Sequence, residues 1–139
     1  MENRNLRKYF ENEILSSPKE RLVLLIYDKL LKTLNLASSY IEKKDVAATH
    51  EQLIKSQEII YVLIKHLNME AGDISKNLYQ LYEYSLWKLK QANIKKDHVE
   101  DVKEVINIFR ELKSAWEKAI SINTVDGQNK ENKKISYSV

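Results

Sequence analysis

The feature that most constrains this chain is the near absence of residues that break helices. Among 139 residues there are two glycines and one proline, namely Gly72, Gly127 and Pro18. Hairpin turns and phosphate-binding loops depend on glycine at fixed positions, and the presence of only two glycines in the chain therefore disfavours both. Between these residues, apolar side chains recur at intervals of three and four, which is the period of an amphipathic helix. The sequence therefore predicts an almost wholly helical protein.

Four helices can be placed from their start and stop signals. Ser17-Pro18-Lys19-Glu20 has the pattern of a helix start, with a serine cap, a proline at the first helical position and a glutamate three residues after the cap. Asp45 is the expected cap of the second helix, and Asp97 that of the fourth. Gly72 lies in a stop signal between the second and third helices. We expect helices over about 18–43, 46–67, 74–92 and 98–122.

Each predicted helix has an apolar stripe that we assign to the core. The inward residues are Leu22, Val23, Ile26, Leu30, Thr33, Leu34, Ala37, Ile41, Val46, Leu53, Ile54, Gln57, Ile60, Tyr61, Ile64, Leu67, Ile74, Leu78, Leu81, Tyr82, Ser85, Leu89, Val102, Val105, Ile106, Phe109, Leu112, Trp116 and Ile120. Short connections make successive helices antiparallel. The predicted fold is all-α, an antiparallel up-and-down four-helix bundle over 17–122, with a mobile N-terminal segment (1–16) and a disordered polar tail (123–139).

Composition narrows the class of function. Apolar residues make up 43% and charged residues 31% of the chain, which is ordinary for a globular domain. A net charge of +3 is too small to indicate a nucleic-acid partner. The chain has no cysteine and no apolar run long enough for a signal peptide or a membrane span. We expect a cytosolic protein that does not insert into membranes.

Several apolar residues fall outside the inward stripes. On the predicted second helix these are Ile59 and Leu63, and on the third Tyr79, Leu86 and Trp87. Isolated apolar residues on a surface carry no meaning, but second stripes on several helices are less easily explained. They indicate an outer apolar groove that binds a partner or an end of the chain itself.

No catalytic or metal-binding group can be assembled from the sequence. His50, in Ala48-Thr49-His50-Glu51-Gln52-Leu53-Ile54-Lys55, begins like a zinc motif, but Ile54 stands where a second histidine would be needed. The alternative is phosphotransfer through an exposed histidine on a bundle, although the small glycine expected nearby is missing. We expect a surface histidine, no enzymatic activity, no cofactor and no metal.

Blocks along most of the chain, from about Tyr9 to Ala119, resemble the FliS family of flagellar secretion chaperones. The blocks are Tyr9 with Ile14 and Ser16-Ser17-Pro18, then Leu22-Val23-Leu24-Leu25-Ile26-Tyr27-Asp28, Leu78-Tyr79-Gln80-Leu81-Tyr82-Glu83-Tyr84 preceded by Gly72 and Asn77, Ala92-Asn93-Ile94-Lys95-Lys96-Asp97, and Leu112-Lys113-Ser114-Ala115-Trp116. The chain departs from the family pattern at Ser16, Lys29 and Ala71. These positions affect local packing and turn shape more than function.

The resemblance implies a cytosolic chaperone that binds the disordered C-terminal segment of flagellin and prevents its premature polymerisation before type III export. Export-gate or co-chaperone proteins are further possible partners, and a monomer or weak dimer is expected. Residues expected to bind the client are Ile59, Leu63, Asn77, Tyr79, Leu86, Trp87 and Asn93. Leu6, Tyr9, Phe10 and Ile14 are expected to form a lid that lies in the same groove when no client is bound. A phosphotransfer module and a helical adaptor for another protein remain the alternatives.

Overall fold

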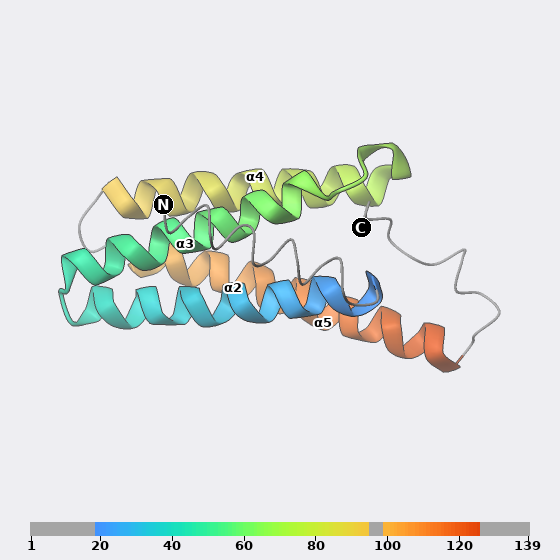
Figure 1. The fold of residues 1–139 in the computed structure, drawn as a ribbon, viewed down its shortest axis with the longest axis horizontal. Coiled ribbons are helices and arrows are strands. Elements are labelled where there is room, and N and C mark those ends of the chain that lie inside the picture. Colours follow the sequence, from blue (N-terminus) through green and yellow to red (C-terminus); the bar gives the residue numbers. More distant parts are fainter. Residues whose placement is uncertain (1–18, 95–98, 126–139) are drawn as a thin grey trace.

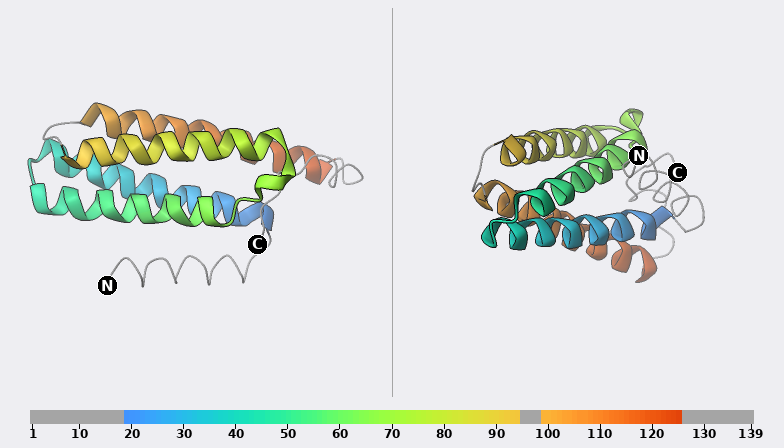
Figure 2. Two further views of the ribbon diagram at one scale, coloured as in Figure 1. Left: turned by 90° about the horizontal axis from the view of Figure 1, so that it is seen from above. Right: turned by 60° about the vertical axis from the view of Figure 1, so that its left-hand side comes forward.

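A computed structural model describes residues 19–94 and 99–125 of the chain. These residues form four long α-helices and one short 3-10 helix, which are α2 (Lys19–Glu42), α3 (Val46–Lys65), η1 (Met69–Ala71), α4 (Asp73–Ile94) and α5 (Val99–Val125). The helices lie side by side in two layers, with α4 and α5 over α3 and α2 (Figures 1 and 2). Each helix packs against two others, and α2 closes the ring by contacting α5. The predicted all-α four-helix bundle is confirmed.

The helix boundaries follow the local sequence signals. Asp45 caps α3, and its side chain accepts a hydrogen bond from the backbone nitrogen of Ala48 at 3.1 Å. Lys44 precedes this cap with a φ of 61°, and Gly72 precedes α4 with a φ of 109°. Such positive φ values are readily adopted by glycine and are uncommon for other residues. α5 continues to Val125 rather than ending at about residue 122. The predicted caps Ser17 and Asp97 lie outside the described residues.

Three aromatic rings from three helices form the centre of the core. Tyr27 of α2 and Tyr82 of α4 are both fully buried, and their hydroxyl oxygens are 2.7 Å apart in a hydrogen bond. The ring of Phe109 on α5 meets Tyr27 edge-on at 5.5 Å and stacks with Tyr82 at 5.9 Å. The hydrogen bond joins α2 to α4, which are diagonal to one another in the bundle. Because each hydroxyl gives the other a polar partner, two tyrosines can be buried here.

Most of the predicted core residues are buried or partly buried, four are exposed, and the side chain of Ile120 lies outside the described part of the structure. Trp116 is buried as predicted, as are the central residues of each inward stripe. Val46 and Ile74 are instead exposed because each lies in the first turn of its helix, at an end of the bundle. Leu81 and Tyr61 are at the edges of their stripes and are also exposed. The predicted core was therefore wrong at these four positions.

Among the described residues, no helix is both long enough and apolar enough to span a membrane. The same residues contain no cluster of three or more histidine, aspartate or glutamate side chains that could hold a metal ion.

Candidate functional site: the outer surface of α4

The outer surface of α4 carries a stripe of exposed apolar and aromatic side chains. Ile74, Leu81, Tyr84 and Trp87 are all exposed, and Trp87 has 54% of its surface accessible. Their spacing of seven, three and three residues places them along one broad side of the helix. Leu81 and Ile74 were predicted to be core residues, so the exposed stripe is longer than the sequence indicated. Apolar side chains gathered in this way are typical of a protein-binding surface.

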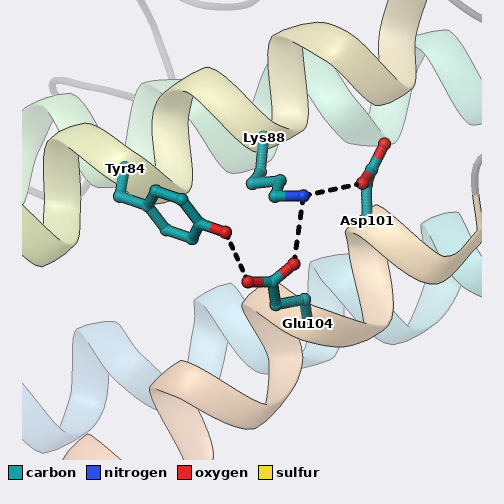
Figure 3. A network of polar contacts seen from close by, with 4 residues as sticks. All are labelled: Tyr84, Lys88, Asp101 and Glu104. Carbon is teal, nitrogen blue, oxygen red and sulfur yellow. Dashed lines mark hydrogen bonds and ion pairs between the residues drawn. The ribbon is translucent and has the colours of Figure 1, made fainter.

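A network of polar contacts beside Trp87 joins α4 to α5 (Figure 3). The Tyr84 hydroxyl donates a hydrogen bond to Oε2 of Glu104. The Lys88 ammonium donates to Oδ1 of Asp101 at 3.2 Å and is 3.1 Å from Oε1 of Glu104. It also lies 5.7 Å from the centre of the Trp87 ring. These contacts fix the position of Lys88 between the two aromatic rings and the two carboxylates.

The network keeps its charges over a wide range of pH. The hydrogen bonds that Glu104 accepts from Tyr84 and Lys88 lower the pKa of its carboxyl group. The contacts of Lys88 with Glu104 and Asp101 raise the pKa of its ammonium group. The hydrogen bond to Glu104 likewise raises the pKa of the Tyr84 hydroxyl. At neutral pH Glu104 is therefore a carboxylate, Lys88 an ammonium group and Tyr84 a neutral phenol.

The predicted client-binding residues of α4 lie on two different sides of that helix. Asn77 and Trp87 are exposed on its outer side. Tyr79, Leu86 and Asn93 follow one another at intervals of seven residues, so they share the side that faces α3. Oδ1 of Asn93 is 2.9 Å from Nδ1 of a histidine on α3. The α4 residues therefore do not form one surface.

Three of the predicted client-binding residues are buried in the bundle. Ile59, Leu63 and Leu86 have 1%, 2% and 3% of their surface exposed, so their predicted position on an outer stripe was wrong. Tyr79 is partly buried and packs against the core. Leu24 and Leu31 of α2 also pack against the core.

The burial of α3 explains the error for Ile59 and Leu63. Its buried residues are Gln52, Leu53, Ser56, Gln57, Ile59, Ile60, Val62 and Leu63. At about 100° per residue these positions cover roughly 220° of the helix circumference. A surface helix usually buries a stripe little wider than about 100°. The sequence analysis assumed the narrower stripe and so assigned Ile59 and Leu63 to the outside.

His50 is the partner of Asn93 on α3. Its side chain is exposed, and its Nδ1 is 2.9 Å from the amide oxygen of Asn93, to which it donates when that nitrogen is protonated. The bond links the first turns of α3 to the last turn of α4. The expected lid residues Leu6, Tyr9, Phe10 and Ile14 lie outside the described residues.

The fold and this surface define the structural class of the protein: it is an all-α four-helix bundle with an exposed apolar stripe on one helix. The family model described as "Flagellar protein FliS" matches residues 1–123. A flagellar secretion chaperone FliS of Bacillus subtilis (strain 168) is 33% identical over 118 residues, which are 85% of this chain and 87% of that protein. The chaperone of the same name from Vibrio cholerae is 32% identical over 108 residues, covering 77% and 79% of the two chains. The chain therefore belongs to the FliS family.

The network of Lys88, Asp101 and Glu104 was not predicted from the sequence. Each of these charged residues has an ordinary position on an amphipathic helix and carries no motif. The spacing of Tyr84 and Lys88 by one turn, and of Asp101 and Glu104 by nearly one turn, was visible in the sequence. Which turn of α5 lies beside which turn of α4 was not, because that depends on the packing of the whole bundle.

Proposed function

We propose that this protein is a cytosolic flagellar export chaperone that binds the C-terminal segment of flagellin. Bound in this way, flagellin is kept from polymerising until it is delivered to the flagellar type III export apparatus. The observation that carries the proposal is membership of the FliS family over residues 1–123, with curated relatives named flagellar secretion chaperones. The role is one of binding and involves no catalysis.

The exposed residues of α4 support a role in client binding. Trp87 offers a large apolar surface, and Asn77 an exposed amide that can donate to and accept from an extended backbone. Tyr79 and the amide nitrogen of Asn93 extend the surface toward α3. Because these residues lie on different sides of α4, a client that touches all of them has to wrap around the helix. Ordering such a segment costs roughly 2–5 kcal/mol, so affinity requires many contacts.

We propose that residues 1–14 act as a lid that lies in the client-binding groove when no client is bound. The support comes from α3, where Ile59 and Val62 are almost completely buried. Within the buried arc of α3, Gln57 lies at the edge that faces α4, and Val62 lies at the opposite edge. Among the described elements α3 packs against α2 and α4, and its buried arc of roughly 220° is wider than the apolar stripe of about 100° typical of a surface helix. A lid carrying Leu6, Tyr9, Phe10 and Ile14 would cover the rest, and its departure would expose Ile59 and Val62 to the client.

Deleting residues 1–14 tests the lid. The shortened chain should bind the flagellin segment more tightly, because the client no longer competes with the lid for the groove. Amide hydrogen exchange around Ile59 and Val62 should also become faster in the free protein. A second variant replaces Leu6 and Phe10 with serine in the full-length chain. It should tighten client binding and speed amide exchange in the same way, because it weakens the lid without shortening the chain. Unchanged or weaker binding of the shortened chain would refute the lid.

Trp87→Glu tests the chaperone role of the α4 surface. The full chain should delay the polymerisation of purified flagellin, followed by light scattering, and Trp87→Glu should lose about 30-fold in client affinity if Trp87 is a hot spot. Val46→Glu places the same charge on an exposed apolar residue at the end of the bundle and should leave the delay unchanged. Circular dichroism should show the same helix content for both variants. Equal delays for Trp87→Glu and the wild type would remove Trp87 from the binding surface.

The free chain is proposed to be a monomer or a weak dimer. Export-gate or co-chaperone proteins would bind the chaperone together with its client. Sedimentation of the free and client-bound chain would measure the stoichiometry.

A further inference from the structure

The exposed stripe of α4 and the adjacent carboxylates of α5 together form a surface that we call the acidic face. Its residues are Ile74, Asn77, Leu81, Tyr84 and Trp87 of α4 and Glu100, Asp101, Glu104 and Glu111 of α5. Tyr84 and Trp87 are in contact, with ring centres 6.2 Å apart, and the network of Figure 3 joins them to α5. The apolar residues Ile74, Leu81, Tyr84 and Trp87 follow one another at intervals of seven, three and three. This is the spacing with which a helix receives a second amphipathic helix.

Negative charge dominates the acidic face although the chain as a whole carries a net charge of +3. Glu100, Glu104 and Glu111 recur at intervals of four and seven on α5, so they line the same side of that helix. Lys88 lies among them and contacts Asp101 and Glu104, and the exposed Lys118 follows Glu111 by seven residues on the same side of α5.

Two lysines follow Trp87 on α4, and both ammonium groups are already in contact with other residues: that of Lys88 lies 5.7 Å from the centre of the Trp87 ring. Lys88 reaches across to α5, and the Lys90 ammonium lies over the ring of Tyr61 on α3, 5.8 Å from its centre. Glu83, one turn before Trp87, adds a further carboxylate and bonds the Tyr79 hydroxyl, whose pKa it raises. A partner side chain that approaches Trp87 therefore meets an aromatic surface bordered by Lys88, which is paired with Asp101 and Glu104, and by the carboxylate of Glu83.

We infer that the acidic face binds a helical segment of the client in which lysine or arginine lies one turn from a large apolar residue. The apolar side chain would pack on Leu81 and Trp87, and the cation would lie beside Glu100 or Glu111. The inference rests on the proposed function, because it assigns the charge of the client segment at a surface already proposed to bind it. Charge complementarity of this kind selects among partners as much as it adds affinity.

Charge reversal on the acidic face tests the inference. Calorimetric titration would measure the affinity of the C-terminal fragment of flagellin from the same bacterium for the wild-type chain and for the double variant Glu100→Lys/Glu111→Lys. The double variant should bind about tenfold more weakly, and its affinity should depend less on salt between about 0.05 and 0.5 M. Glu70→Lys/Glu117→Lys makes the same charge change at exposed positions elsewhere and should bind as the wild type does. Thermal unfolding checks that every variant folds.

Exchanging charges between the two proteins separates recognition from folding. Replacing a lysine or arginine of the flagellin fragment with glutamate should weaken binding to the wild-type chain and restore binding to Glu100→Lys/Glu111→Lys. Equal binding of the wild type and this double variant would overturn the inference and leave the proposed function intact. No binding of the fragment to the folded wild type would overturn both. Self-association that Trp87→Glu abolishes, with client binding unchanged, would assign the face to a second copy and also overturn the inference.

Discussion

Removing the hydroxyl of Tyr27 or Tyr82 should destabilise the bundle, and removing both should cost less than the sum of the two changes. The two oxygens are 2.7 Å apart and both side chains are buried, so each single change to phenylalanine leaves the other hydroxyl without this partner in the core. A buried polar group deprived of its hydrogen bond costs about 1–3 kcal/mol. Removing both oxygens also removes that penalty, and replacement of both partners by apolar groups of the same shape can be nearly neutral.

The assay is urea unfolding of Tyr27→Phe, Tyr82→Phe and the double variant, followed by circular dichroism. We expect each single variant to lose about 1–2 kcal/mol of unfolding free energy, and the double variant to lose less than the two losses added together. Tyr84→Phe is the matched control for a lost tyrosine hydroxyl on the surface, and it should cost less than either core variant. Single variants within about 0.3 kcal/mol of the wild type, or strictly additive losses, would refute the account of how α2 and α4 are joined.

Two further predictions concern the core and the network of Figure 3. Phe109→Ala should cost roughly 3–5 kcal/mol of unfolding free energy, because it removes the ring that packs against both buried tyrosines; a loss below about 1 kcal/mol would show that the core can collapse around the gap. The folded-state pKa of Glu104 is lowered by Tyr84 and Lys88, so its contribution to stability is present above its unfolded pKa and is lost as pH falls through the lower folded value. Carboxyl chemical shifts measured against pH should give Glu104 a pKa below 4.5 in the wild type, and a value nearer to it in Tyr84→Phe; a pKa at or above 4.5 in the wild type would contradict the network.

The helices were predictable because their signals are local. Apolar residues at intervals of three and four, the cap at Asp45 and the stop at Gly72 are all read within a few residues. The exposed Val46 and Ile74 were misplaced because periodicity alone does not tell where a bundle ends. Each has the right phase for the core but lies in the first turn of its helix, beyond the reach of the neighbouring helices.

The candidate site was less predictable because it depends on how helices pack together. Ile59 and Leu63 were placed outside by assuming a narrow buried stripe, and the width of that stripe is set by how many segments cover α3. Trp87 was placed outside correctly because its position is far from every inward residue of α4. The contact of Lys88 with Glu104 required the register between α4 and α5, which no local pattern encodes.

The central claim is that the folded bundle binds the C-terminal segment of flagellin as that segment becomes ordered. Titration calorimetry of the full chain with this segment from the same bacterium, repeated at several temperatures, tests it most directly. The account predicts a Kd below about 1 μM and a large negative change in heat capacity, because apolar surface is buried as the client folds onto the chaperone. A folded bundle that gives no heat of binding and shifts no signal of the segment would contradict the claim.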